Sequence, residues 1–89
     1  MGTSATIADP RISDVVVTDT ALSVTLRDGR KVSAPLDWFP KLKAASAADR
    51  KAWQLSAAGH GIHWPNIDED LSIEGLLRGQ PAPPLKHPA

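Results

Sequence analysis

The stretch Leu22-Ser-Val-Thr-Leu-Arg-Asp-Gly-Arg-Lys-Val-Ser-Ala-Pro-Leu36 decides the first half of the fold. Apolar and polar side chains alternate on both sides of its Arg27-Asp28-Gly29 centre, which is the period of a half-buried β-strand. A two-residue turn would place the two apolar rows on opposite faces, which the register of a half-buried sheet does not tolerate. A three-residue turn makes the rows coincide and pairs Val24 with Val32. We therefore predict a β-hairpin with a three-residue turn and Gly29 in its left-handed position.

Two further segments are predicted to be strands. Residues 12–18 are rich in β-branched side chains, and residues 62–64, Ile-His-Trp, form a short segment that Pro65 ends. Gly59 and Gly61 break the chain before that segment. Together with the hairpin, these segments predict a small antiparallel sheet of three to four strands.

Two to three short helices are expected to pack against the sheet. Side chains suited to helix N-caps stand at three positions, Asp37, Ser46 and Ser72. The first helix is predicted to extend to about Ala45, with Pro40 tolerated in its first turn. The second should reach about Gln54, and the third should end at Gly79. The fold class predicted is therefore α+β.

Length and composition indicate one domain. The chain has 89 residues, of which 42% are hydrophobic, and it has no cysteine, which excludes disulfides and cysteine-ligated zinc. No apolar run approaches the roughly 20 residues that cross a membrane, and no signal peptide is evident, so we expect a cytoplasmic protein. Residues 1–11 are predicted to be a flexible arm, 12–79 the domain, and 80–89 a proline-rich tail.

Charge is balanced overall but unevenly distributed. Residues 27–51 contain seven basic and three acidic side chains, whereas residues 68–74 contain four acids and no base. Such asymmetry can orient a partner, although two ordinary solvated surfaces would give the same pattern. Binding of single-stranded nucleic acid through the basic segment, next to Trp38 and Phe39, is a further hypothesis. The net charge of zero argues against it.

The 60–70 segment contains the side chains best suited to chemistry. They are His60, His63, Asp68 and Asp70. These nitrogen and oxygen ligands would suit zinc or manganese, and the carboxylates would suit acid/base catalysis. The alternative is that one histidine bonds to the backbone and one lies at the surface, while the acids precede the last helix and interact with its N-terminus. We therefore assign no catalytic residue, metal ligand or cofactor from the sequence.

The three tryptophans supply most of the aromatic surface. Trp38, Trp53 and Trp64 are expected mainly in the core, but tryptophan is also a frequent anchor of protein interfaces. They therefore join the two histidines and two aspartates as candidate partner-binding residues. A domain of this size buries about 60% of its chain surface, so a homo-oligomer is also a reasonable expectation.

Two segments carry a resemblance to a known family. Residues 26–42, Leu-Arg-Asp-Gly-Arg-Lys-Val-Ser-Ala-Pro-Leu-Asp-Trp-Phe-Pro-Lys-Leu, and residues 61–77, Gly-Ile-His-Trp-Pro-Asn-Ile-Asp-Glu-Asp-Leu-Ser-Ile-Glu-Gly-Leu-Leu, resemble the bacterial domain-of-unknown-function 2442 family, DUF2442. The resemblance covers residues 12–79. It implies a small α+β domain with an antiparallel sheet on one side and short helices on the other, and it carries no catalytic residues.

The same resemblance implies a partner. Members of this family tend to be encoded beside another small protein, an arrangement that resembles toxin–antitoxin pairs. Some members carry a helix-turn-helix domain after this module, where the present chain has a proline-rich segment, so independent operator binding is not expected. The function expected is an interaction module, antitoxin-like in a two-protein system. The alternatives are a metal-dependent or acid/base enzyme and a nucleic-acid-binding protein.

Overall fold

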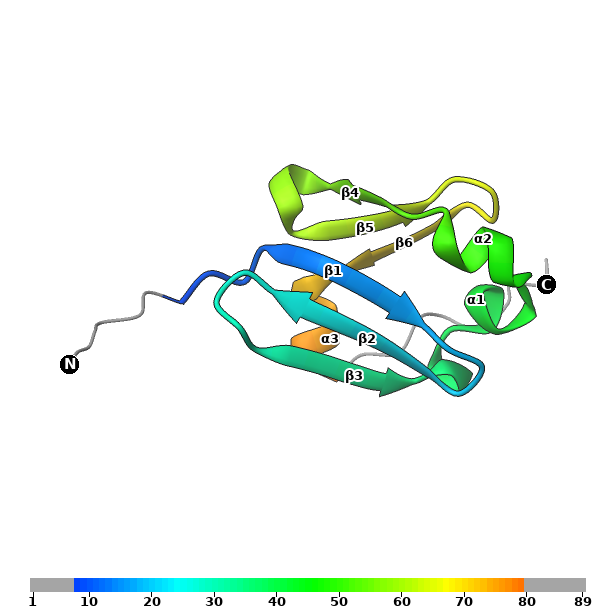
Figure 1. Ribbon diagram of the computed structural model, residues 1–89, viewed down its shortest axis with the longest axis horizontal. Helices are drawn as coiled ribbons and strands as arrows, with labels where there is room; N and C mark the ends of the chain where they lie inside the picture. The colour runs from blue at the N-terminus through cyan, green and yellow to red at the C-terminus, as the bar shows by residue number, and fades with distance from the viewer. Residues whose placement is uncertain (1–7, 80–89) are drawn as a thin grey trace, which may run out of the picture.

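The computed structural model describes residues 8–79, which form two three-stranded antiparallel sheets and three short α-helices (Figure 1). The first sheet consists, in spatial order, of β1 (Ile12–Val17), β2 (Ala21–Leu26) and β3 (Lys31–Pro35). The second consists of β4 (Gln54–Ser56), β5 (Gly61–Trp64) and β6 (Glu69–Ser72). The helices are α1 (Pro40–Ala44), α2 (Ala47–Lys51) and α3 (Ile73–Leu77), with 3-10 turns η1 (Leu36–Trp38) and η2 (Ala57–Gly59).

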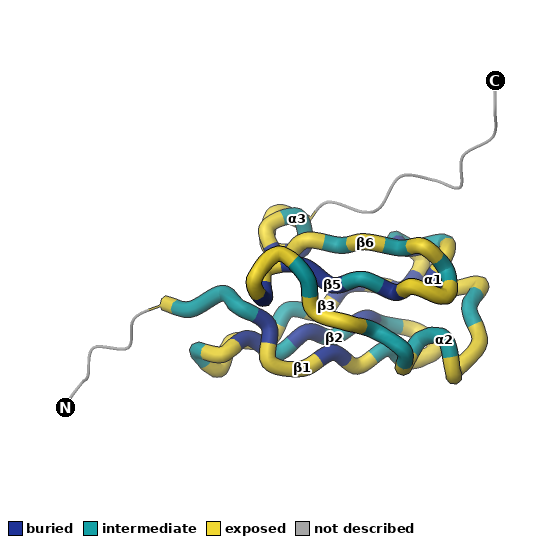
Figure 2. The backbone as a smooth tube through the Cα atoms, turned by 90° about the horizontal axis from the view of Figure 1, so that it is seen from above, coloured by how far each residue is buried: buried dark blue, intermediate teal, exposed yellow. Residues whose placement is uncertain are grey.

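The two sheets and the helices enclose one core. In Figure 1 the second sheet lies above the first, α3 lies behind β2 and β3, and α1 and α2 lie at the end where β1 turns into β2. The β2–β3 turn lies at the opposite end of the first sheet. Figure 2 shows β5 as the buried strand of the second sheet, with the more exposed β6 beside it.

The predicted hairpin is confirmed in detail. Val24 pairs with Val32 as the three-residue turn requires. The amide of Leu26 donates to the carbonyl of Arg30 at 2.8 Å across the turn, and Gly29 has a φ of 95°. The apolar rows of β2 and β3 therefore face the same side, where the core lies. Alternation over ten residues was sufficient to fix both the turn and the register.

A bulge in β1 lets two apolar side chains with irregular spacing both face the core. Ile12 and Val15 are three residues apart, so a regular strand would point them to opposite faces. The register with β2 shifts between Ile12 and Asp14, and the extra residue, Ser13, donates its hydroxyl to the Thr25 carbonyl at 3.1 Å. With one residue absorbed in this way, Ile12 and Val15 both enter the core, where they are 0% and 5% exposed.

The structure has more strands than expected, and they form two sheets instead of one. The α+β class is confirmed, but the structure has six strands in two sheets rather than three to four strands in one. The strand around residues 62–64 is present as β5, and its neighbours β4 and β6 were not anticipated. Strands of three and four residues are too short to show a clear period, and β6 is dominated by acidic residues that disfavour strands.

Two of the three predicted helix caps are confirmed. The hydroxyl of Ser46 accepts from the Asp49 amide at 3.1 Å, and that of Ser72 accepts from the Gly75 amide at 3.0 Å. The predicted helix from Asp37 is divided instead into η1 and α1. Proline disfavours helical backbone at the preceding residue, so α1 begins at Pro40.

The second predicted helix also differs in length. The structure ends α2 at Lys51 and begins β4 at Gln54, where the sequence predicted one continuous helix. α3 ends at Leu77 with Arg78 as its C-cap, and the positive φ of Gly79, 75°, agrees with the predicted end of the last helix. Each α-helix has five residues, so its stability comes from packing and capping rather than from helix propensity.

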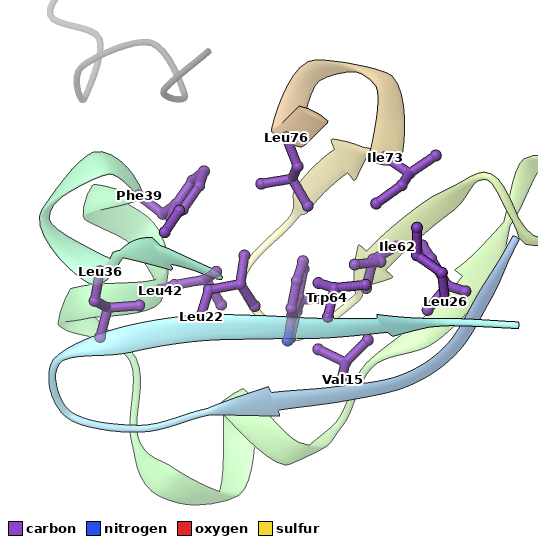
Figure 3. Close-up of a cluster of buried hydrophobic side chains, with 13 residues drawn as sticks. Val15, Leu22, Leu26, Leu36, Phe39, Leu42, Ile62, Trp64, Ile73 and Leu76 are labelled. Carbon is purple, nitrogen blue, oxygen red and sulfur yellow. The ribbon is translucent and has the colours of Figure 1, made fainter. Parts of the chain in front are cut away.

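The core draws on every layer of the molecule. Thirteen apolar side chains form one buried cluster, ten of which are labelled in Figure 3. Trp64 and Phe39 are the largest of its fully buried side chains. From the other elements come Val15, Leu22, Leu26, Leu36, Leu42, Ile62, Ile73 and Leu76. Within residues 8–79 no helix has the length and apolar character required to cross a membrane.

Two aspartate–arginine pairs bind the start of the described chain to the hairpin turn. The carboxylate of Asp28 is 4% exposed and accepts from Arg30 Nη2 at 2.8 Å and from the Asp9 amide at 2.9 Å. Asp9 in turn pairs with Arg11 at 2.8 Å. Residues 9–11, which the sequence assigned to a flexible arm, are thus held in place. Residues 1–7 of that arm and the tail at 80–89 lie outside the described residues.

These pairs predict a loss of stability in acid. Hydrogen bonds from the Arg30 side chain and backbone lower the pKa of Asp28 to about 2. A carboxyl whose pKa falls on folding contributes stability above its unfolded pKa of about 3.9, and that contribution disappears as the pH falls toward the folded value. The variant Asp28→Asn should therefore be less stable than wild type near neutral pH, and the difference should shrink from about pH 4 to about pH 2.

Urea unfolding followed by far-UV circular dichroism at a series of pH values measures this difference directly. Asp37→Asn is the matched control because the Asp37 side chain is 73% exposed. A difference between wild type and Asp28→Asn that stays constant down to the lowest pH would contradict the prediction.

Candidate interaction surface on the second sheet

A polar row crosses the outer face of the second sheet. Gln54 of β4 is opposite His63 of β5, which is opposite Asp70 of β6. Residues directly opposite in an antiparallel sheet share a face, so the three side chains lie side by side. Ile62 and Trp64 point to the other face, where both are 0% exposed. The Gln54–His63–Asp70 row is therefore on the face turned away from the core.

Within this row, the His63 imidazole and the Asp70 carboxylate are in direct polar contact. His63 Nδ1 lies 2.9 Å from Asp70 Oδ1, and the side chains are 31% and 68% exposed. With Nδ1 donating to the carboxylate, Nε2 is left as the hydrogen-bond acceptor of the imidazole. A molecule that lies on this face can donate a hydrogen bond to His63 Nε2. It can also place a cation or a hydrogen-bond donor against the Asp70 carboxylate.

Gly61 allows close packing beside this pair. It is opposite Ser56 on β4 and Ser72 on β6, in the row next to His63. A Cβ atom at position 61 would lie 2.6 Å from Ser56 Oγ. A side chain at this position would therefore displace Ser56, and its absence lets Ser56 pack closely against β5, where Gly61 is buried.

The loop between β4 and β5 is conformationally strained. Ala57 and Ala58 have φ values of 50° and 56°, and Gly59 follows at 91°. Left-handed backbone costs an L-residue about 1–2 kcal/mol. The Ala57 carbonyl accepts from the His60 amide at 3.1 Å and lies 3.2 Å from His60 Nδ1. His60 is thus the histidine that bonds to the backbone, and its side chain lies at the end of β5 in an exposed position.

The acids of residues 68–70 lie in a turn and in a strand of the second sheet. They precede the last helix as predicted, and Glu69 and Asp70 also belong to β6, which the sequence did not indicate. Asp68 is in the turn before it with a φ of 51°, and its carbonyl accepts from Lys41 Nζ at 2.8 Å. Glu69 Oε1 accepts from the Asp70 amide at 3.0 Å, and burial raises the pKa of Glu69. The hydrogen bond from Lys41 therefore attaches the turn that contains Asp68 to α1.

The tryptophans divide into one buried and two partly buried residues. Trp64 is 0% exposed and donates from Nε1 to the Arg50 carbonyl at 3.1 Å, so it fills the core and offers no surface to a partner. Trp53 and Trp38 pack against the core and retain some exposure. Trp38 contacts Phe39 edge to face, with ring centroids 6.4 Å apart. Trp38 and Trp53 stay candidates for partner contact.

The four residues considered for metal or acid/base chemistry do not converge. His60 precedes β5 and Asp68 lies in the turn after it, so they lie at opposite ends of the strand. Only His63 and Asp70 are in direct contact. In the part of the chain from residue 8 to residue 79, no three of its histidine and acidic side chains are grouped as metal ligands would be.

The basic segment is divided between the two ends of the first sheet. Arg27, Arg30 and Lys31 surround the β2–β3 turn, and the other four basic residues are in or beside α1 and α2 (Figure 1). Several of these charges are already paired. Arg30 pairs with Asp28, Lys43 with Asp37, and Arg50 with Asp19. The basic residues are thus spread over two ends of the first sheet, and three of them are paired with acids.

Gln54 and the pairing of His63 with Asp70 were missed by sequence reasoning. Gln54 was placed at the end of a helix, and Asp70 was placed in the segment before another helix, whereas both belong to strands. The Pro65-Asn66 pair between two short segments is a turn signal that favours a β5–β6 hairpin. Counting across that turn would have brought Asp70 opposite His63.

Two small antiparallel sheets around a shared core, with a polar row on the outer face of one of them, define a small α+β protein. Residues 12–82 match the family described as "Protein of unknown function (DUF2442)", and the chain belongs to this family. The resemblance of residues 26–42 and 61–77 is thereby confirmed. Among the curated proteins there was no match.

Two solved structures share the fold. A protein of unknown function from Rhodospirillum rubrum matches with a TM-score of 0.69 and 26% identity, over 83% of this chain and 92% of that one. The uncharacterized protein CV0863 from Chromobacterium violaceum matches with a TM-score of 0.69 and 20% identity, over 83% of this chain and 70% of that one. At this level of identity the second match indicates a common fold alone.

Proposed function

We propose that this protein is a small interaction module that binds another small protein through the outer face of its second sheet. The Gln54–His63–Asp70 row carries the proposal because its three side chains are aligned by strand register on a face that the core does not use. Its polar groups differ in kind, since an amide, an imidazole and a carboxylate stand side by side. Such a set can fix the register and orientation of a bound partner.

The partner we propose is the protein encoded beside this one, with the present chain as the antitoxin-like member of the pair. The family resemblance supports this choice, because its members tend to have such a neighbour. Trp53 precedes β4 and retains some exposure, so it could supply an apolar anchor at the border of the polar row.

Acid/base catalysis is a second candidate that one observation favours. The 2.9 Å contact of Asp70 with His63 Nδ1 is the arrangement by which a carboxylate orients a histidine base. However, the Asp70 side chain is 68% exposed, and electrostatic catalysis gains most of its strength in sites that exclude water. Recognition is therefore the function that the geometry supports better.

Co-expression with the neighbouring gene product, followed by size-exclusion chromatography, tests the proposal. Wild type should co-elute with the partner, and the double variant His63→Ala/Asp70→Asn should bind at least about tenfold more weakly in titration calorimetry. Asp37→Asn is the matched control, since Asp37 is an exposed acid of η1 on another side of the fold. Separate elution of the two wild-type proteins, or unchanged affinity of the double variant, would contradict the proposal.

A further inference from the structure

The outer face of the first sheet is a second uncovered surface. The core occupies the inner face of this sheet, and in Figure 1 its other side is turned to the viewer with no helix or strand in front of it. Strand register places eight residues on this outer face: Asp14 and Val16 of β1, Ala21, Ser23 and Thr25 of β2, and Lys31, Ser33 and Pro35 of β3.

Most side chains on this face are short. Ser23 Oγ lies 2.9 Å from Ser33 Oγ, so two central hydroxyls satisfy each other and stay close to the sheet. Val16, beside Ser23, is 50% exposed and is the one large apolar side chain of the face. Faces with short side chains allow another sheet to approach to about 10 Å, the distance of packed sheets.

The two charged residues of the face have opposite signs and lie at its two opposite edges. Asp14, Thr25 and Lys31 form one row across the three strands, so an acid lies at one edge and a base at the other. Neither Asp14 nor Lys31 forms an ion pair within residues 8–79. A two-fold axis parallel to β2 and above the face would exchange the two edges. Asp14 of each copy would then lie over Lys31 of the other.

From this register we infer that the outer face of the first sheet binds a second copy of this chain. A two-fold interface requires a surface that is complementary to itself, and a row with opposite charges at equal distances from its centre meets that requirement. The same operation places Val16 over Ser33 and stacks the serine and threonine side chains of β2. An interface built on this face of three short strands is small, so the dimer is expected to be weak and in rapid exchange.

This inference concerns the other sheet and does not depend on the proposed partner, so it is tested with the full chain alone. Sedimentation equilibrium over a series of concentrations should show self-association of wild type that weakens as salt screens the ion pairs. Asp14→Lys would place two lysines opposite each other at both edges and should weaken the dimer at least about tenfold.

Reversal of both charges provides the decisive control. The double variant Asp14→Lys/Lys31→Asp restores opposite charges across the axis, so its dimer should recover most of the wild-type affinity. Both positions are exposed, and thermal unfolding of the variants would confirm that the fold is intact. A wild type that stays monomeric up to about 1 mM, or a double variant no stronger than Asp14→Lys, would overturn the inference.

Discussion

Replacing Trp64 by alanine should remove most of the stability of this protein. The side chain is 0% exposed and is the largest of the fully buried residues. Truncating a buried tryptophan costs about 3–5 kcal/mol because apolar contacts are lost and a cavity is left. A small domain lies toward the lower end of the usual stability range of about 5–15 kcal/mol, so a loss of this size should bring Trp64→Ala close to its unfolding midpoint at room temperature.

Trp64→Phe separates packing from hydrogen bonding. Phenylalanine retains much of the buried ring but cannot donate to the Arg50 carbonyl, which Trp64 Nε1 contacts at 3.1 Å. An unsatisfied carbonyl and a smaller ring should cost about 1–3 kcal/mol.

Far-UV circular dichroism in urea measures both variants without relying on tryptophan emission. Trp53→Ala is the matched control, since its ring is only partly buried, and a loss as large as that of Trp64→Ala would refute the assignment of Trp64 as the central core residue.

Arg50→Ala is expected to have the second largest effect. Its guanidinium donates from Nε to the Leu42 carbonyl and from Nη2 to the Lys43 carbonyl, both at 2.9 Å. These carbonyls lie at the end of α1, where a positive charge also interacts favourably with the helix. The Arg50 side chain is only 11% exposed, so these bonds are largely shielded from water. We expect a loss of about 2–3 kcal/mol, the range of hydrogen bonds from charged groups.

Two further variants distinguish the contributions of Arg50. Lysine has one ammonium group and cannot reproduce the fork that reaches two carbonyls, so Arg50→Lys should lose most of the same stability. Nη1 also contacts Asp19 at 2.8 Å, but the Asp19 side chain is 97% exposed. Asp19→Ala should therefore change stability by less than about 1 kcal/mol. Urea unfolding measures the stability of each variant. Equal losses for Asp19→Ala and Arg50→Ala would show that Arg50 acts through its ion pair with Asp19 and not through the carbonyls at the end of α1.

Features that depend on neighbours in the chain could be predicted. The alternation on both sides of Arg27-Asp28-Gly29 gave the register of β2 and β3, because one shift would have exposed an apolar row. The serine caps of α2 and α3 were predicted because the bonded amide lies three residues away. Errors arose where a proline or a short strand interrupted the pattern, as in the helix expected from Asp37.

The candidate site was predicted only as a set of residues. The sequence indicated that His63 and Asp70 belong to an informative segment, but it placed Asp70 before a helix rather than in a strand. It also included Trp64, which the structure buries. A β5 strand of four residues carries too little periodicity to show which side chains face outward, because that depends on the core it covers.

By itself, the sequence determined the family, the α+β class, the β2–β3 hairpin and two helix caps, all of which are set by local pattern or by side chains a few residues apart. Only the tertiary structure decided that a second sheet forms, that a bulge at Ser13 turns Ile12 inward, and that Asp70 lies opposite His63. The physical reason is that these features depend on burial of one segment against another. Side chains such as Ile62 and Trp64 select their face of β5 when they meet the first sheet, and the polar row takes the face that is left.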